Sequence, residues 1–298
     1  TGSGNSKTLF FNSFHNVEMD VEKVGWSIDS DSIEIGQSTI RSAGGRPKKA
    51  SFESLNYFNY NKYINYQNIS TYNPISTIKA FSEAKNIREL DVEQLAKALN
   101  PKYSVQTITP LLLDLVENGF IYYDKENKLV IVKDKTINNA AASRQQIDYD
   151  NIRAISSSRK TNGVIDLNNY DLKVNGVNNV ILSDSQLVGF KPYTKEIVFQ
   201  ENRNINFNGK LFAGFTIIDG TDFQFKYDQF KIEGNNIDSV LIRIPDPNRG
   251  LDRTGRPYLI PLGTRIEDMK GVISIDEEDN KSSRKNNQEY PMLTSDYP

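Results

Sequence analysis

The chain has 298 residues, a net charge of -2 and no cysteine. This length exceeds what one hydrophobic core usually fills, so more than one domain or an elongated fold is expected. The absence of cysteine excludes disulfide bonds, thiolate zinc sites and cysteine nucleophiles, and the near-neutral charge argues against a general attraction to nucleic acid or anionic membranes.

The chain carries no apolar run near the roughly 20 residues that a membrane-spanning helix requires, so the sequence predicts no membrane span. It begins Thr1-Gly2-Ser3-Gly4, without a methionine. We therefore expect it to be part of a longer polypeptide, whose remainder would be among its partners.

Residues 1–73 form a predicted N-terminal β-rich segment. Apolar residues alternate with polar ones over 17–21, 26–28 and 33–35, and such alternation is typical of short strands. Glycines and clusters of aspartate and serine between these runs indicate turns.

Four tyrosines near the end of this segment are spaced three apart: Tyr57, Tyr60, Tyr63 and Tyr66. This spacing fits neither a strand nor a regular helix. One interpretation is that the rings pack against a neighbouring β layer. The other is a stacking platform for sugars or bases, which makes the four tyrosines candidate interaction residues.

Residues 74–133 are the only stretch whose pattern indicates helices. Pro74 begins one amphipathic helix, Asp91 can cap a second over 92–99, and Ser104 can cap a third over 104–118. Pro110 is expected to kink or restart the third helix, and Asn118-Gly119 to end it. The apolar runs 120–123 and 129–132, with a polar turn between them, predict a hairpin.

This order of elements resembles a winged helix-turn-helix domain. The resemblance rests on Leu95-Ala96 in the first motif helix, Ser104 at the start of the second, and the passage from Leu115 to Ile121 into the hairpin. It implies that the second motif helix would lie in the major groove of DNA, with Gln106 and Thr107 as contact residues.

The charge of that helix contradicts DNA binding. It carries Asp114 and Glu117 but neither lysine nor arginine. Affinity for DNA depends on the neutralisation of several phosphates, and Gln106, Thr107 and Lys125 or Lys128 in the hairpin turn are too few to provide it. We therefore expect the helix to contact protein or to act as a spacer, and nucleic acid is not an expected partner.

Residues 134–162 are expected to be a linker, and 163–298 a C-terminal β-rich domain with a polar tail. Short apolar runs separated by glycines fill 163–244, as in a sandwich, barrel or solenoid. Within this part, Phe207-Asn208-Gly209 and the run 225–230 resemble layers of very large β-rich bacterial cell-envelope proteins. That resemblance implies a location in the periplasm, the outer membrane or the cell surface.

Residues for catalysis are few. His15 is the only histidine, which argues against a Ser-His-Asp site or a histidine metal centre, and an ordinary structural role is expected for it. Acids such as Asp166, Asp171 and Asp219 lie in the strand-rich half, where glycosidases would place a carboxylate pair. Acids at strand ends are also common in any soluble β fold, so we assign no catalytic, cofactor or metal residues.

The sequence thus predicts a mainly β protein, solenoid-like or built of stacked sheets, with a small winged-helix insertion at 74–133. The expected function is non-enzymatic: a structural or protein-interaction segment of a larger bacterial cell-envelope protein. A carbohydrate-active or carbohydrate-binding β-helix protein is the first alternative. A winged-helix DNA-binding regulator is the second.

Overall fold

The structure is a computed structural model that describes residues 9–36, 47–69, 72–253, 255 and 257–295. Thr1–Gly4 therefore lies outside the described residues. The chain divides into two compact units. The helical unit consists of Thr1–Phe10 and Leu55–Tyr149, and the β unit consists of Phe11–Ser54 and Asp150–Pro298.

This division differs from the predicted segments 1–73, 74–133, 134–162 and 163–298. The helical unit extends further in both directions than the predicted insertion. It interrupts the sequence of the β unit between Ser54 and Asp150. Strands make up 44% of the chain and helices 20%, which confirms the mainly β prediction.

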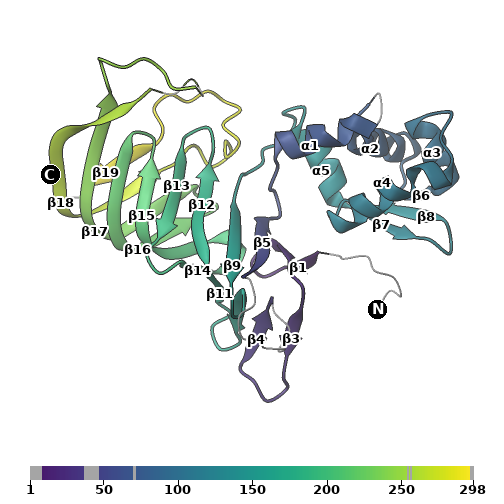
Figure 1. Cartoon of the computed structure of the whole chain (residues 1–298), viewed down its shortest axis with the longest axis horizontal. Helices are drawn as coiled ribbons and strands as arrows, with labels where there is room; N and C mark the ends of the chain where they lie inside the picture. The colour runs from purple at the N-terminus through teal and green to yellow at the C-terminus, as the bar shows by residue number, and fades with distance from the viewer. Residues whose placement is uncertain (1–8, 37–46, 70–71, 254, 256, 296–298) are drawn as a thin grey trace. The chain divides into compact units, whose positions relative to one another are not determined.

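The described strands of the β unit form one large antiparallel sheet that curls on itself (Figure 1). Their order is β1-β2-β5-β9-β12-β13-β15-β14-β11-β10-β4-β3, and β16, β17, β18 and β19 follow one another from β15. The strands are β1 (Phe10–Asn12), β2 (Val17–Asp20), β3 (Val24–Trp26), β4 (Ser32–Ile35), β5 (Lys48–Ser54), β9 (Arg153–Ser158), β10 (Gly163–Asp166), β11 (Leu172–Asn175), β12 (Val177–Ser183), β13 (Val188–Pro192), β14 (Glu196–Phe199), β15 (Ile205–Ala213), β16 (Thr216–Lys226), β17 (Lys231–Pro245), β18 (Leu259–Ser274) and β19 (Met292–Ser295), with a 3-10 turn η2 (Glu201–Arg203) between β14 and β15.

The sequence pattern explains which face of this sheet is buried. Along β15 every second residue is buried, because successive side chains of a strand point to opposite faces. The buried faces carry a run of aromatic rings in which Phe190 stacks on Phe207 and Phe207 on Phe223, with centroid distances of 3.6 and 5.1 Å. The β unit therefore has its own hydrophobic core.

The helical unit has a separate core and a three-stranded sheet in the order β6-β8-β7. Among its described helices, as in the rest of the described chain, none is long and apolar enough to cross a membrane. Its elements are α1 (Tyr60–Asn65), η1 (Tyr66–Ile69), α2 (Pro74–Lys85), β6 (Glu89–Asp91), α3 (Val92–Leu99), α4 (Val105–Glu117), β7 (Ile121–Asp124), β8 (Leu129–Val132) and α5 (Asp134–Ala142).

Local capping chemistry sets the ends of these helices, largely as predicted. The Asp91 carboxylate accepts a hydrogen bond from the Gln94 backbone N–H at 2.9 Å, which caps α3. Gly119, with φ of 77°, takes the left-handed conformation that follows the end of α4. The predicted restart at Pro110 is wrong, because α4 runs through this proline as one helix.

Residues 134–142 form helix α5 and are not the predicted linker. The expectation failed because the segment is polar in composition. Its buried side chains are Thr136, Asn139 and the alanines 140–142, and the Thr136 hydroxyl donates to the Phe120 carbonyl. The rest of the predicted linker contains strand β9, which pairs with β5.

Candidate functional site

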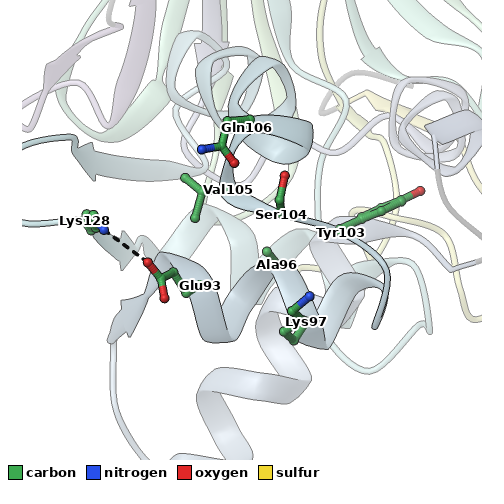
Figure 2. A pocket seen from close by; sticks show the side chains of 8 residues that line it. All are labelled: Glu93, Ala96, Lys97, Tyr103, Ser104, Val105, Gln106 and Lys128. Atoms are coloured by element: carbon green, nitrogen blue, oxygen red, sulfur yellow. Dashed lines mark hydrogen bonds and ion pairs between the residues drawn. The ribbon is translucent and has the colours of Figure 1, made fainter.

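A pocket of about 280 Å³ opens in the helical unit where α3, the turn before α4 and the β7–β8 turn meet (Figure 2). Its apolar wall consists of Ala96, Tyr103 and Val105, and polar side chains form its remaining lining. The complete lining is Glu93, Ala96, Lys97, Tyr103, Ser104, Val105, Gln106 and Lys128.

Short-range hydrogen bonds shape this pocket. The Asn100 side chain accepts from the Lys102 N–H at 2.9 Å, and the Asn100 carbonyl accepts from the Tyr103 N–H at 2.9 Å, which closes the turn between α3 and α4. The Ser104 hydroxyl then accepts from the Thr107 N–H at 3.3 Å and caps α4. Ala96, which is buried, forms part of the pocket wall on α3.

The two lysines of the pocket are both engaged within the unit. Lys128 Nζ lies 3.1 Å from the Glu93 carboxylate (Figure 2). Lys97 Nζ donates to the Pro101 carbonyl at 3.1 Å. Both partners of the Lys128–Glu93 pair are more than half exposed, so the pair adds little stability. Two lysines and one glutamate leave the lining with a net charge of +1.

The exposed face of α4 beyond the pocket is apolar and acidic. Leu113 is 44% exposed, and Asp114 and Glu117 are exposed as well. The structure therefore places the acids of α4 on its solvent face, where they would repel a phosphate backbone. A binding partner of this face must tolerate apolar and negatively charged groups.

The structure separates the two residues that were predicted on α4. Gln106 is exposed and lines the pocket, so it is available to a ligand. Thr107 is exposed next to it but is not part of the lining, and its N–H and hydroxyl both interact with the Ser104 hydroxyl. The sequence places Lys128 in the turn of the predicted hairpin, whereas no motif marks Lys97 as a site residue beyond its polar position on α3.

The four tyrosines do not form one surface. Tyr60 is 55% exposed, whereas Tyr63 and Tyr66 are each 7% exposed and belong to the core of the helical unit. The Tyr63 hydroxyl lies 2.5 Å from the Ser76 hydroxyl, and the Tyr66 ring meets Phe120 edge-on with centroids 5.7 Å apart. Tyr57 is half-buried.

For Tyr63 and Tyr66 the stacking-platform interpretation is wrong. Their rings are buried in the core of the helical unit and cannot offer a face to a ligand. Burial raises the pKa of the Tyr66 hydroxyl, and the nearby Asp114 carboxylate raises it further. Tyr66 is therefore a structural residue beneath α4.

The acids of the β unit mostly serve local structure. Asp166 accepts from the Asn168 backbone N–H at 2.8 Å, and Asp171 accepts from the Asn169 side chain at 3.1 Å. Asp219 lies 3.3 Å from Lys210 Nζ. Each of these carboxylates has a nearby partner in a turn or on a neighbouring strand.

Asp150 is the most deeply buried acid of the β unit. Its carboxylate accepts hydrogen bonds from the hydroxyls of Ser54 and Tyr227 at 2.6 and 3.0 Å and from the Ile152 N–H at 3.0 Å. The Arg203 guanidinium stacks 3.6 Å above the Tyr227 ring. Burial raises the pKa of the Asp150 carboxyl, and the three donors and Arg203 partly offset that rise. This cluster stabilises the place where the β unit is interrupted.

His15 is 1% exposed, and its two ring nitrogens have no hydrogen-bond partner in the described part of the chain. Burial lowers the pKa of its imidazole, while the nearby Tyr170 carbonyl and Asp171 carboxylate oppose the change. In the unfolded state the imidazole has its ordinary pKa of 6.5. Just below this pH the unfolded chain therefore binds a proton at His15, whereas the folded chain does not. Below this pH the folded β unit loses stability, whereas above it the histidine is neutral in both states.

We therefore expect the free energy of unfolding of the β unit to fall below pH 6.5 by at most about 1.4 kcal/mol per pH unit through His15. A His15→Phe variant, which keeps a ring against Phe14, should lack this contribution. Urea unfolding of both proteins between neutral and mildly acidic pH measures how much more stability the wild type loses. The carboxyl groups titrate in both proteins, so their contribution cancels in this comparison. Parallel pH curves for the two proteins would contradict the prediction.

No group of three or more histidine or acidic side chains in the described residues is arranged to hold a metal ion. Comparisons of the chain with models of known protein families, with characterised proteins and with solved structures gave no match. The chemistry of the pocket and of α4 is therefore the basis of the proposed function.

Proposed function

We propose that this chain is a non-enzymatic protein-interaction segment of a larger bacterial cell-envelope protein. In this proposal the helical unit is a winged-helix-like module that docks a partner protein through the pocket between α3 and α4. The β unit serves as its structural scaffold.

The order of elements supports the winged-helix interpretation. Helix α2, strand β6, helices α3 and α4 and the β7–β8 hairpin follow one another, and β8 lies between β6 and β7 in the sheet. This arrangement is similar to a winged helix-turn-helix domain, with α4 in the position of the second motif helix and the β7–β8 turn in that of the wing. A fold of this kind does not fix the function, which depends on the site.

One observation carries the choice of partner: the exposed residues of α4 are neutral or acidic. Gln106, Leu113 and Asp114 are exposed, and no basic side chain lies on this helix. A protein can fill the pocket against the apolar wall formed by Val105 and Ala96. A nucleic acid would have to accept two carboxylates close to its phosphates.

The pocket is tested by selecting peptides from a displayed random library on the purified chain. We expect the selected peptides to lose at least about tenfold in affinity when the pocket wall is charged by Val105→Asp. Leu113→Asp is the matched control, because it adds the same charge on the same helix outside the pocket lining. It should change the affinity by less than about twofold. Gln106→Lys, at an exposed position, tests the pocket again without risk to the core.

Two outcomes would contradict the proposal. Peptides that bind the Val105→Asp and Gln106→Lys variants as well as the wild type would place the interaction elsewhere. Tight binding of a short labelled DNA duplex in low-salt buffer, weakened by Lys97→Ala and Lys128→Ala, would favour the DNA-binding alternative.

The glycan alternative is tested by adding oligosaccharides in the same binding assay. The envelope location is tested by detecting the protein in fractions of its source cells.

A further inference from the structure

The turn between β1 and β2, residues 13–16, contacts parts of the β unit that are distant from it in the order of strands. Four strands, β5, β9, β12 and β13, lie between β2 and β15 in that order. In a flat sheet this would separate β2 from β15 by about 24 Å, because neighbouring strands lie about 4.8 Å apart. The turn nevertheless bonds directly to η2, the connection between β14 and β15, so it closes the curl of the sheet at this place.

Hydrogen bonds hold this closure together. The Asn202 N–H donates to the Phe14 carbonyl at 3.0 Å. The Arg203 N–H donates to the His15 carbonyl, also at 3.0 Å. The side-chain amide of Asn16 donates to the side-chain carbonyl of Asn202 at 3.0 Å. We call residues 14–16 with these bonds to η2 the clasp.

The closed clasp contains groups in unfavourable states. Tyr170 of the β10–β11 turn, whose ring lies 5.6 Å from that of Phe14, has a φ of 63°, and Arg203 has a φ of 66°. This left-handed region is costly for such large side chains. In the described part of the chain, Arg203 Nη1 and both ring nitrogens of His15 are buried without a hydrogen-bond partner. Strain and unpaired polar groups therefore make the closed state easier to open.

His15 is the titratable group of the clasp, and three neighbouring groups favour its charged form. From the β10–β11 turn these are the Tyr170 carbonyl and the Asp171 carboxylate, and from β14 it is the Phe199 carbonyl. Burial has the larger effect and lowers the pKa of the imidazole below its ordinary value. A proton therefore binds His15 more readily when the clasp is open and water reaches the ring.

Two further charged side chains belong to η2. The Arg203 guanidinium donates to the Asn202 side chain at 2.8 Å and stacks on the Tyr227 ring, and Glu201 is exposed. Within the described residues neither of them is a hydrogen-bond partner of the imidazole. The clasp thus gives a protonated His15 no dedicated acceptor in its closed state.

We propose that the clasp is a pH-operated device, in which protonation of His15 releases residues 14–16 from η2 and from the β10–β11 turn and so opens the curl of the sheet. The open state gains population as the pH falls below 6.5, the ordinary pKa of the imidazole. Only the contacts of the clasp break, so this opening is distinct from unfolding of the whole β unit. The inference concerns the β unit and does not depend on the pocket of the helical unit.

Hydrogen exchange of the Asn202 and Arg203 amides tests the clasp directly, because both amides donate to the turn. In the wild type we expect their opening equilibrium to rise by up to about thirtyfold between about pH 7.5 and about pH 5.0, the limit for a group that titrates at 6.5 only in the open state. The His15→Gln variant cannot bind this proton and should show no such rise. Dividing the wild-type rate by the variant rate at each pH removes the pH dependence of the chemical exchange step.

Two controls separate the clasp from other causes. The amides of β16 and β17 should keep their protection at the lower pH, because these strands stay paired. Asn16→Ala removes the side-chain bond to Asn202 but keeps His15. It should speed exchange of the Asn202 and Arg203 amides at both pH values and retain the pH-dependent rise.

Two results would overturn the proposal. One is a ratio of wild-type to variant rates that is the same at both pH values. The other is an equal rise for the amides of β16 and β17, which would mean that the unit unfolds as a whole. His15→Phe should behave like His15→Gln, so a folding defect in one of these variants, seen by circular dichroism, leaves the other to decide.

Discussion

Replacement of Asp150 by alanine is expected to lower the free energy of unfolding of the β unit by about 3–5 kcal/mol. The carboxylate is 0% exposed and accepts hydrogen bonds from the hydroxyls of Ser54 and Tyr227. Alanine would remove the carboxylate that accepts from these two buried hydroxyls, and Arg203 would lose its nearby negative charge. Scanning calorimetry of the whole chain resolves this loss if the two units melt separately.

The Asp150→Asn variant separates the two parts of this effect. Asparagine keeps the size of the side chain and one carbonyl acceptor but cannot ionise. We expect it to lose less stability than alanine, because part of the hydrogen-bond network survives. A loss below about 1 kcal/mol in the alanine variant would contradict the prediction, since that value is only the average for point mutations in general.

The position of Asp150 explains how the β unit accommodates a whole second unit in its sequence. Strands β5 and β9 lie on either side of the interruption and pair directly, from Lys48 opposite Ser158 to Glu53 opposite Arg153. The Ser54 N–H also donates to the Ile152 carbonyl at 3.0 Å. The two connections to the helical unit therefore leave from adjacent strands, which is the geometry that inserted domains require.

Local signals were sufficient to predict most of the helical unit. Asp91, Ser104 and Gly119 each act within a few residues, so the sequence places α3 and α4 almost to the residue. The sequence did not predict helix α5, because its buried side consists of alanine, threonine and asparagine. These residues do not show the apolar periodicity of a typical amphipathic helix. Composition hid it.

The order of strands could not be read from the sequence for a different reason. Alternation shows that a strand exists and which face it buries, but not which strand lies beside it. The pairing of β5 with β9, across the entire helical unit, is an example. The structure shows a curled antiparallel sheet and does not confirm the predicted solenoid-like stacking.

The candidate pocket combines predictable and unpredictable parts. Gln106 follows from the position of α4 in the winged-helix-like pattern. The approach of Lys97 and Lys128 to the same pocket depends on how α3 packs beside the β7–β8 turn, which no local pattern encodes. The tyrosines failed as candidates because spacing alone does not reveal burial, and Tyr63 and Tyr66 contact the core of their own unit.

Replacement of Phe223 by alanine is expected to lower the free energy of unfolding of the β unit by about 3–5 kcal/mol. The ring is 0% exposed and stacks on Phe207. It also covers two glycines: a Cβ added at Gly220 would lie 3.0 Å from this ring, and one at Gly234 would lie 3.2 Å from it. Neither glycine has a side chain to move into the space that the ring would leave.

The cavity should therefore stay open, which places the expected loss toward the upper end of that range. Phe215→Ala is the matched control, because Phe215 is 42% exposed and should cost far less. Urea unfolding of both variants, followed by circular dichroism of the β unit, measures the two losses. Equal losses in the two variants would show that the stacked rings do not hold the curled sheet together, and the core of the β unit would have to be sought elsewhere.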